Sequence, residues 1–169
     1  MSKLEKKSSP SQSARALYVE GEFWKRRQDF CAGQAPRKIA HIMRLLESDD
    51  FRSFCRQSSV LRIVDIGCGA GKVSTGIAGE LRELFPELRI EIDGYDLSPQ
   101  AIEVARRDNE EGQWHCADFS VENKQWDLAV LCDIIEHVEE PVQFLEDVAR
   151  KSRFIVVFKF RTFCSSFAS

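Results

Sequence analysis

The stretch RIVDIGCGAGKVSTGIAGEL, residues 62–81, runs from β-branched residues through three alternating glycines into a segment with helical periodicity. An apolar run that does not alternate with polar residues is typical of a parallel strand covered on both faces. After the glycines, Val73, Ile77, Leu81 and Leu84 recur on one face of a predicted helix that Pro86 ends. A strand, a glycine turn and a helix in this order predict a unit of an open α/β sheet, which binds its ligand at the carboxyl ends of the strands.

The same alternation continues along the chain and predicts a doubly wound, mostly parallel α/β sheet of about five strands. Ser98 and Pro99 are typical of a helix N-cap and first helical position. We expect helices at 35–48, 98–109 and 139–151 besides the one after the glycines. We expect strands at 60–67, 88–96, 112–119, 126–133 and 153–160.

The composition is typical of a soluble globular domain, and the charge favours a small-molecule partner. The chain has 169 residues, 43% hydrophobic and 30% charged, with a net charge of -3, which gives no overall attraction to nucleic acid. Its six cysteines lack zinc-site spacing and are expected to be buried thiols in a reducing compartment. No signal peptide and no apolar run of about 18 residues is seen, which predicts a cytoplasmic protein without a membrane partner.

The chain divides into four segments by composition. Residues 1–14 are polar and Ser-rich and are predicted to be a flexible tail. Residues 15–59 are expected to form an N-terminal helical cap, which begins with aromatic residues between 18 and 30. Residues 60–160 form the predicted α/β domain, and 161–169 a short tail. His41 and His115 are expected to be surface or packing residues.

The glycine spacing and two strand-end acids favour an adenosine-containing ligand. Gly67, Gly69 and Gly71 form Gly-x-Gly-x-Gly, whereas a dinucleotide fingerprint is Gly-x-Gly-x-x-Gly. Asp96, at the end of the second strand, can accept hydrogen bonds from both hydroxyls of a ribose. Asp118, at the next strand end, is on its own more typical of a turn residue, although it can receive an adenine amino group.

These segments carry a family resemblance. VDIGCGAGK, IDGYDLSPQAIEVAR, CADF and WDLAVLCDIIEHVEEPVQFL resemble, in this order, the successive motifs of class I S-adenosylmethionine-dependent methyltransferases. The match is closest to the small-molecule type whose fourth motif ends in Glu-His-Val, and it covers residues 35 to 160. Four ordered motifs are specific for the cofactor but do not identify the methyl acceptor.

The resemblance implies that S-adenosylmethionine lies across the ends of four strands. Gly67 and Gly69 would line its methionine portion, Asp65 would orient this turn, and Asp133 would lie beside the transferred methyl. The implied cofactor-binding set is Asp65, Gly67, Cys68, Gly69, Gly71, Asp96, Leu97, Asp118, Phe119 and Asp133. Within it, Asp96 would hold the ribose, Leu97 would pack on adenine, and Asp118 with Phe119 would fix the adenine ring.

The acid-histidine group after the fourth strand is the candidate catalytic set. Asp133, Glu136 and His137 stand at helical offsets of three and four, which would place them on one face near the methyl. We rank a structural or substrate-contact role first, a general base second and a metal ligand third, and we expect no metal.

Two other interpretations remain open. A nicotinamide-dependent oxidoreductase is opposed by the position of Gly71 and by the segment DIIEHVEEP. A truncated cofactor-binding domain, either non-catalytic or dependent on a partner, is suggested by the C-terminus. The family resemblance implies seven strands, yet nine residues, 161–169, follow the fifth. The apolar fifth strand reads as an interior strand, and at an edge it would favour self-association.

Overall fold

The computed structural model describes residues 22–159, with side chains from residue 33 onward. Within this range five parallel strands form one sheet in the order β3-β2-β1-β4-β5. The strands are β1 Val60–Ile66, β2 Arg89–Asp96, β3 Gly112–Cys116, β4 Trp126–Cys132 and β5 Ser152–Phe158. The order reverses between β1 and β4, and open α/β sheets bind ligands at such a switch point.

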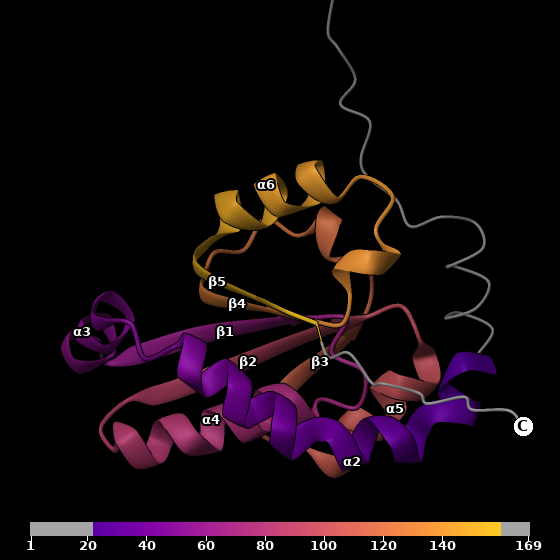
Figure 1. Cartoon of the computed structure of the whole chain (residues 1–169), viewed down its shortest axis with the longest axis horizontal. Helices are drawn as coiled ribbons and strands as arrows, with labels where there is room; N and C mark the ends of the chain where they lie inside the picture. Colours follow the sequence, from indigo (N-terminus) through magenta and orange to yellow (C-terminus); the bar gives the residue numbers. More distant parts are fainter. Residues whose placement is uncertain (1–21, 160–169) are drawn as a thin grey trace, which may run out of the picture.

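Helices cover both faces of the sheet, as predicted. Figure 1 shows α6 on one face, and α2, α4 and α5 on the other. The helices are α2 Glu22–Leu45, α3 Asp49–Gln57, α4 Lys72–Leu84, α5 Pro99–Asp108 and α6 Pro141–Lys151. Two 3₁₀ turns, η1 Phe119–Val121 and η2 Ile135–His137, lie after β3 and β4. The doubly wound α/β fold is confirmed.

Each face of the sheet has its own apolar core. Ile42 of α2 and Phe51 of α3 are buried with Ile63 of β1 and Ile77 of α4, so the N-terminal helices share the larger core. Under α6, Val64 of β1 packs in a second cluster together with aromatic residues from three segments: Tyr95, Phe119 and Trp126. The glycine loop after β1 therefore rests on a sheet that is packed on both sides.

The N-terminal helix is longer than predicted. We expected a helix at 35–48, but α2 begins at Glu22, passes through Pro36 and ends at Leu45. A proline in a helix interior costs roughly 3 kcal/mol, so the sequence favours a start near it. Packing on α4 opposes that cost, because Ile39 lies over Gly76, where a β-carbon would be 2.2 Å from Ile39 Cδ1. The aromatic residues expected in the cap before residue 33 lie outside the described side chains.

Three further expectations need correction or comment. Leu84, expected on the buried face of α4, is 54% exposed because it is the last residue of the helix. Cys55 and Cys68 are buried as expected, but Cys116 is exposed, since it ends the outer strand β3. Within residues 22–159 every helix is too short or too polar to cross a membrane.

Candidate cofactor site

The turn after β1 has a backbone that only glycine adopts easily. Gly67, Gly69 and Gly71 have φ values of 74°, 54° and 73°, in the left-handed region where a side chain is disfavoured. The amides of Gly67 and Cys68 both donate to the carbonyl of Tyr95, at 2.8 and 3.1 Å. The loop is therefore anchored to the end of β2, at the carboxyl edge of the sheet.

At two of the three glycines, a protein side chain occupies the position that a β-carbon would take. A β-carbon on Gly67 would lie 2.7 Å from Cδ1 of Ile134, which follows β4. A β-carbon on Gly71 would lie 2.4 Å from Cη2 of Trp114 in β3. The packing of Ile134 and Trp114 against the main chain therefore requires glycine at both ends of the loop.

Asp96 links the end of β2 to the middle of the glycine loop. Its Oδ2 accepts from the amide of Gly69 at 2.9 Å, and its Oδ1 accepts from the amide of Ser98 at 2.8 Å. Burial raises the pKa of Asp96, although these backbone donors act against the shift. Ser98 caps α5 as predicted, because its Oγ accepts from the amide of Ala101 at 3.3 Å. A carboxylate accepts about four hydrogen bonds, so Asp96 retains capacity for a ligand.

Asp65, at the end of β1, is a buried acid with an unsatisfied oxygen. It is 1% exposed, and its Oδ2 has no hydrogen-bond partner among the described residues. Burial raises the pKa of Asp65 to about 7, and the carboxyl of Asp96 adds to the shift, whereas Ser74 and Lys38 oppose it. Buried polar atoms are normally hydrogen-bonded, so this oxygen is a candidate acceptor for a donor from a ligand.

Lys38 of α2 reaches the carboxyl end of β4, which the sequence did not indicate. Its Nζ lies 2.7 Å from Oδ2 of Asp133. Asp133 itself has a φ of 57°, and its amide donates to the carbonyl of Phe158 at 2.8 Å. Non-glycine residues in this conformation are uncommon and occur preferentially at functional sites. Lys38 was missed because a lysine within a helical segment carries no signal of a partner far along the chain.

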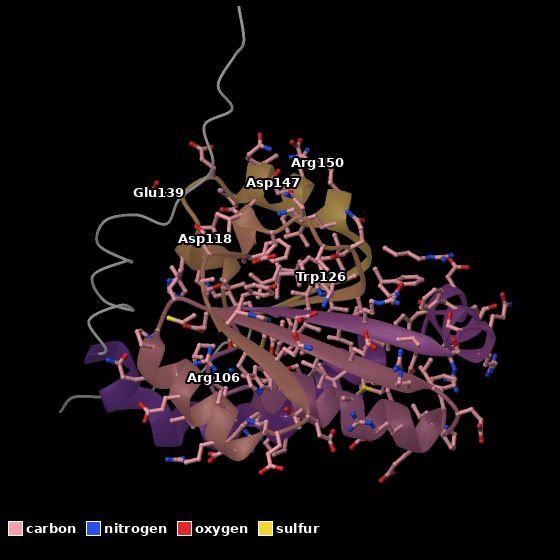
Figure 2. All side chains as sticks on the ribbon, turned by 180° about the vertical axis from the view of Figure 1, so that it is seen from behind. Arg106, Asp118, Trp126, Glu139, Asp147 and Arg150 are labelled. Carbon is pink, nitrogen blue, oxygen red and sulfur yellow. The ribbon has the colours of Figure 1, made fainter. Side chains whose placement is uncertain are left out.

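The two residues expected at the adenine ring lie at η1. Asp118 Oδ1 accepts from the amide of Ser120 at 2.9 Å and so caps this turn. Phe119 is 3% exposed, with its ring 5.9 Å from Tyr95 and 5.5 Å from Trp126, centroid to centroid. Figure 2 shows Asp118 and Trp126 on the side of the sheet that carries α6. Leu97 is half-buried directly after β2. Their contact with adenine stays a prediction.

The segment that carries Asp133, Glu136 and His137 is not the helix that their spacing suggested, and their common face near the methyl group stays a prediction. The segment after β4 is a single 3₁₀ turn, Ile135–His137, and the left-handed residue Asp133 lies outside it. Asp133 contacts Lys38, whereas Glu136 Oε1 lies 3.3 Å from Nζ of Lys159. Among the described residues, no group of three or more His, Cys, Asp and Glu side chains has a metal-binding arrangement.

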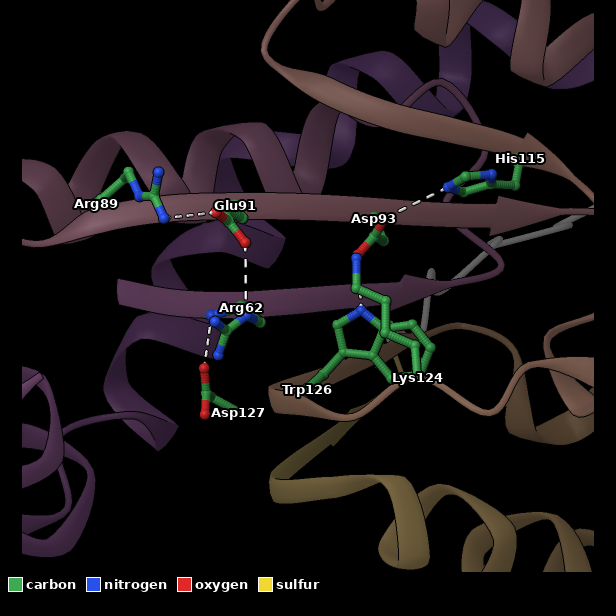
Figure 3. A network of polar contacts seen from close by, with 8 residues as sticks. All are labelled: Arg62, Arg89, Glu91, Asp93, His115, Lys124, Trp126 and Asp127. Carbon is green, nitrogen blue, oxygen red and sulfur yellow. Dashed lines mark hydrogen bonds and ion pairs between the residues drawn. The ribbon is translucent and has the colours of Figure 1, made fainter. Parts of the chain in front are cut away.

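The two other histidines contact aromatic or acidic side chains. The ring of His41 is exposed and stacks on Phe158, with centroids 5.6 Å apart. His115 Nε2 lies 3.4 Å from Asp93 Oδ1 (Figure 3). Trp126 also donates to the Asp93 carboxylate, at 2.8 Å. Both histidines are thus packing or surface residues, as expected.

Comparison with known proteins defines the class that the fold and the glycine loop indicate. Residues 64–152 match the family model described as a methyltransferase domain. The match covers more than half of the chain, from β1 to the start of β5. The chain belongs to this methyltransferase family, and its sheet has the Rossmann-like class I methyltransferase fold.

Individual relatives agree with this assignment. A mitochondrial ubiquinone biosynthesis O-methyltransferase from Schizosaccharomyces pombe is 29% identical over 126 residues, 68% of this chain and 43% of the relative. A malonyl-[acyl-carrier protein] O-methyltransferase from Hahella chejuensis is 28% identical over 131 residues, 75% of this chain and 45% of the relative. This chain therefore spans less than half the length of both proteins.

A solved structure has a similar fold. The crystal structure of magnesium protoporphyrin IX methyltransferase from Synechocystis PCC 6803 with bound SAM has a TM-score of 0.61 against this chain at 16% identity. The likeness covers 83% of this chain and 70% of the other.

Proposed function

We propose that the chain binds S-adenosylmethionine at the carboxyl edge of β1, β2 and β4 and supports methyl transfer to a small-molecule acceptor. The observation that carries this proposal is the left-handed glycine loop held against Asp96 by the 2.9 Å hydrogen bond from the amide of Gly69. Main chain at one strand end and a carboxylate at the next are the features that bind an adenosine ligand in such sheets.

The residues at β1 and β4 fit the methionine end of this cofactor. The unpaired Oδ2 of Asp65 is placed to accept from an ammonium group, which would favour the ionised form of this acid. Lys38, now paired with Asp133, offers a positive charge for the cofactor's carboxylate. The main chain of Gly67 and Gly69 would line the methionine portion. When bound, the cofactor supplies a methyl group on a sulfonium that is already a good leaving group.

The residues at β2 and β3 fit the adenosine end. Asp96 would accept from the ribose hydroxyls with its remaining lone pairs, and Leu97 would cover the adenine. Asp118 would meet the adenine amino group. The burial of Phe119 between Tyr95 and Trp126 supports a role in fixing this turn.

The names of the two curated relatives support a small-molecule or carrier-bound acceptor. The protein's part in the reaction is mainly to orient acceptor and methyl group, which contributes up to about 7–11 kcal/mol in favourable cases. Glu136 pairs with Lys159, which favours a structural or substrate-contact role for Glu136 and His137 over a general base. The free cysteines favour a reducing compartment, and we propose a cytoplasmic location.

A second proposal, a partner-dependent domain, is favoured by β5. Within the described residues β5 pairs with β4 alone, and Val157 is 42% exposed. An apolar strand whose outer edge is unpaired among the described residues favours association, so we propose that the chain pairs with a second copy through β5. Light scattering of the purified chain should give the mass of a dimer; a monomer at high concentration would contradict the pairing.

The cofactor proposal is tested by calorimetry with S-adenosylmethionine, S-adenosylhomocysteine and NAD on the same preparation. We expect micromolar binding of the two adenosyl compounds and no binding of NAD. Binding of NAD alone would overturn the proposal in favour of an oxidoreductase.

A further inference from the structure

The glycine loop is held at its far end by a side chain from another element. Asn109, the C-cap residue of α5, donates from Nδ2 to the carbonyl of Ala70 at 2.8 Å. Ala70 lies between Gly69 and Gly71, so this bond fixes the part of the loop that follows the contact with Asp96. It joins segments that are 39 residues apart in the sequence.

Helix capping does not account for this bond. The backbone amide of Asn109 already donates to the carbonyl of Ala105 at 2.9 Å, which closes the last turn of α5. The side chain of Asn109 reaches Ala105 as well, at 3.1 Å, but its shorter bond is the one to Ala70. The amide group thus serves the glycine loop in addition to its own helix.

Asn109 is in turn fixed by β3. The indole Nε1 of Trp114 donates to the carbonyl of Asn109 at 2.8 Å. The carbonyl of Trp114 accepts from both Nε and Nη2 of Arg106, at 3.1 and 2.7 Å. Figure 2 shows Arg106 on the side of the sheet opposite α6. Three hydrogen bonds therefore tie the end of α5 to β3.

The ring of Trp114 fills a space that three glycines leave for it. The residue is 4% exposed. A β-carbon on Gly71, Gly94 or Gly112 would lie 2.4, 2.3 or 2.4 Å from an atom of this ring. The indole is thereby locked between the glycine loop, β2 and β3, and the position of its Nε1 is determined.

We propose that Asn109 is a positioning residue for cofactor binding, with Trp114 as its support. This inference rests on the proposed binding of S-adenosylmethionine. Glycine has more conformational freedom to lose than any other residue, so a loop with three left-handed glycines needs tethers. A loop fixed in its binding conformation loses less freedom when the ligand binds, and it therefore binds more tightly. Asp96 and Asn109 supply these tethers at two adjacent residues of the loop, Gly69 and Ala70.

The test compares Asn109→Asp with the matched control Asn123→Asp, which makes the same chemical change at a site between η1 and β4, away from the glycine loop. In Asn109→Asp a carboxylate oxygen replaces the donor and faces the Ala70 carbonyl. We expect S-adenosylhomocysteine to bind about tenfold more weakly, the size expected when a part-buried carbonyl loses its hydrogen-bond partner. The control should bind like wild type.

The thermal unfolding midpoint of each variant is measured on the same samples. A lower midpoint with unchanged affinity in the folded protein would show a purely structural role and overturn the inference. As the pH is lowered toward the ordinary aspartate pKa of about 3.9, the introduced carboxyl of Asn109→Asp becomes protonated and can donate again. The affinity deficit of this variant relative to wild type should then shrink, whereas that of Asn109→Ala should not. If Asn109→Asp does not fold, Asn109→Ala at neutral pH gives the same comparison. Wild-type protein that fails to bind at all would instead overturn the proposed function.

Discussion

Asp96 has two backbone partners in the structure, and this changes what its removal should do. Replacement by alanine deletes the proposed ribose acceptor and also leaves the amides of Gly69 and Ser98 without their partner. Hydrogen bonds to a charged group contribute about 1.5–3 kcal/mol each. We expect Asp96→Ala to weaken binding of S-adenosylmethionine by more than about tenfold.

The control for this prediction is Asp96→Asn, which keeps one acceptor oxygen for the loop. Calorimetry on folded samples of both variants separates ligand contact from loop support. An unchanged affinity in Asp96→Ala would refute the ribose assignment.

Because the pKa of Asp65 is raised, stability and ligand affinity should depend on pH in opposite directions. The pKa of this acid rises from 3.8 to about 7 in the folded protein because of its burial. The folded chain therefore keeps a proton that the unfolded chain releases. The contribution of Asp65 to the free energy of unfolding is complete below pH 3.8 and is lost as the pH rises through about 7. The ligand-free protein should thus lose this contribution to its free energy of unfolding over that range.

Binding should show the opposite trend, because an ammonium group next to Asp65 favours the ionised acid. We expect the affinity for S-adenosylhomocysteine to increase between about pH 5.5 and about pH 7.5. Asp65→Asn should remove most of this slope and the matching slope in denaturant-measured stability. Equal slopes in wild type and Asp65→Asn would contradict the assigned role.

At the scale of elements, the glycine loop and β3 are coupled through Trp114. A β-carbon at residue 71 would meet the indole at 2.4 Å, at a backbone φ of 73°. We expect Gly71→Ala to destabilise the chain by about 2–3 kcal/mol, from overpacking and strain together. Trp114→Leu should also destabilise it, but the double variant should lose less than the sum of the two. Additive losses in denaturant titrations would mean that the two sites are independent.

The order of elements was predictable because its signals are local. Strand runs, the glycine turn and the Ser98 cap each lie within a few residues, and the structure confirms them. Contacts between distant segments left no such signal. No local pattern pairs Lys38 with Asp133 or Asn109 with Ala70. Helical spacing also suggested a helix after β4, but the left-handed Asp133 precedes a single 3₁₀ turn there.

At the scale of the whole molecule, the proposed site and a network of charged side chains lie at opposite ends of the strands. Arg62, Glu91 and Asp127 interact near the beginning of β1, β2 and β4 (Figure 3), whereas Asp65 and Asp96 lie at the carboxyl ends of β1 and β2. Parallel strands place all carboxyl ends at one edge, so a single ligand can touch several elements there. We therefore expect the ligand to slow backbone exchange at one edge of the sheet.

Hydrogen–deuterium exchange with and without saturating S-adenosylhomocysteine tests this claim most directly. We expect slower exchange of backbone amides in two segments, 65–72 at the glycine loop and 94–101 at the end of β2. Residues 49–57 of α3, which cover the opposite end of the sheet in Figure 1, should exchange as before. Protection of α3 without protection of 65–72 and 94–101, or no protection anywhere, would contradict a cofactor site at the carboxyl edge.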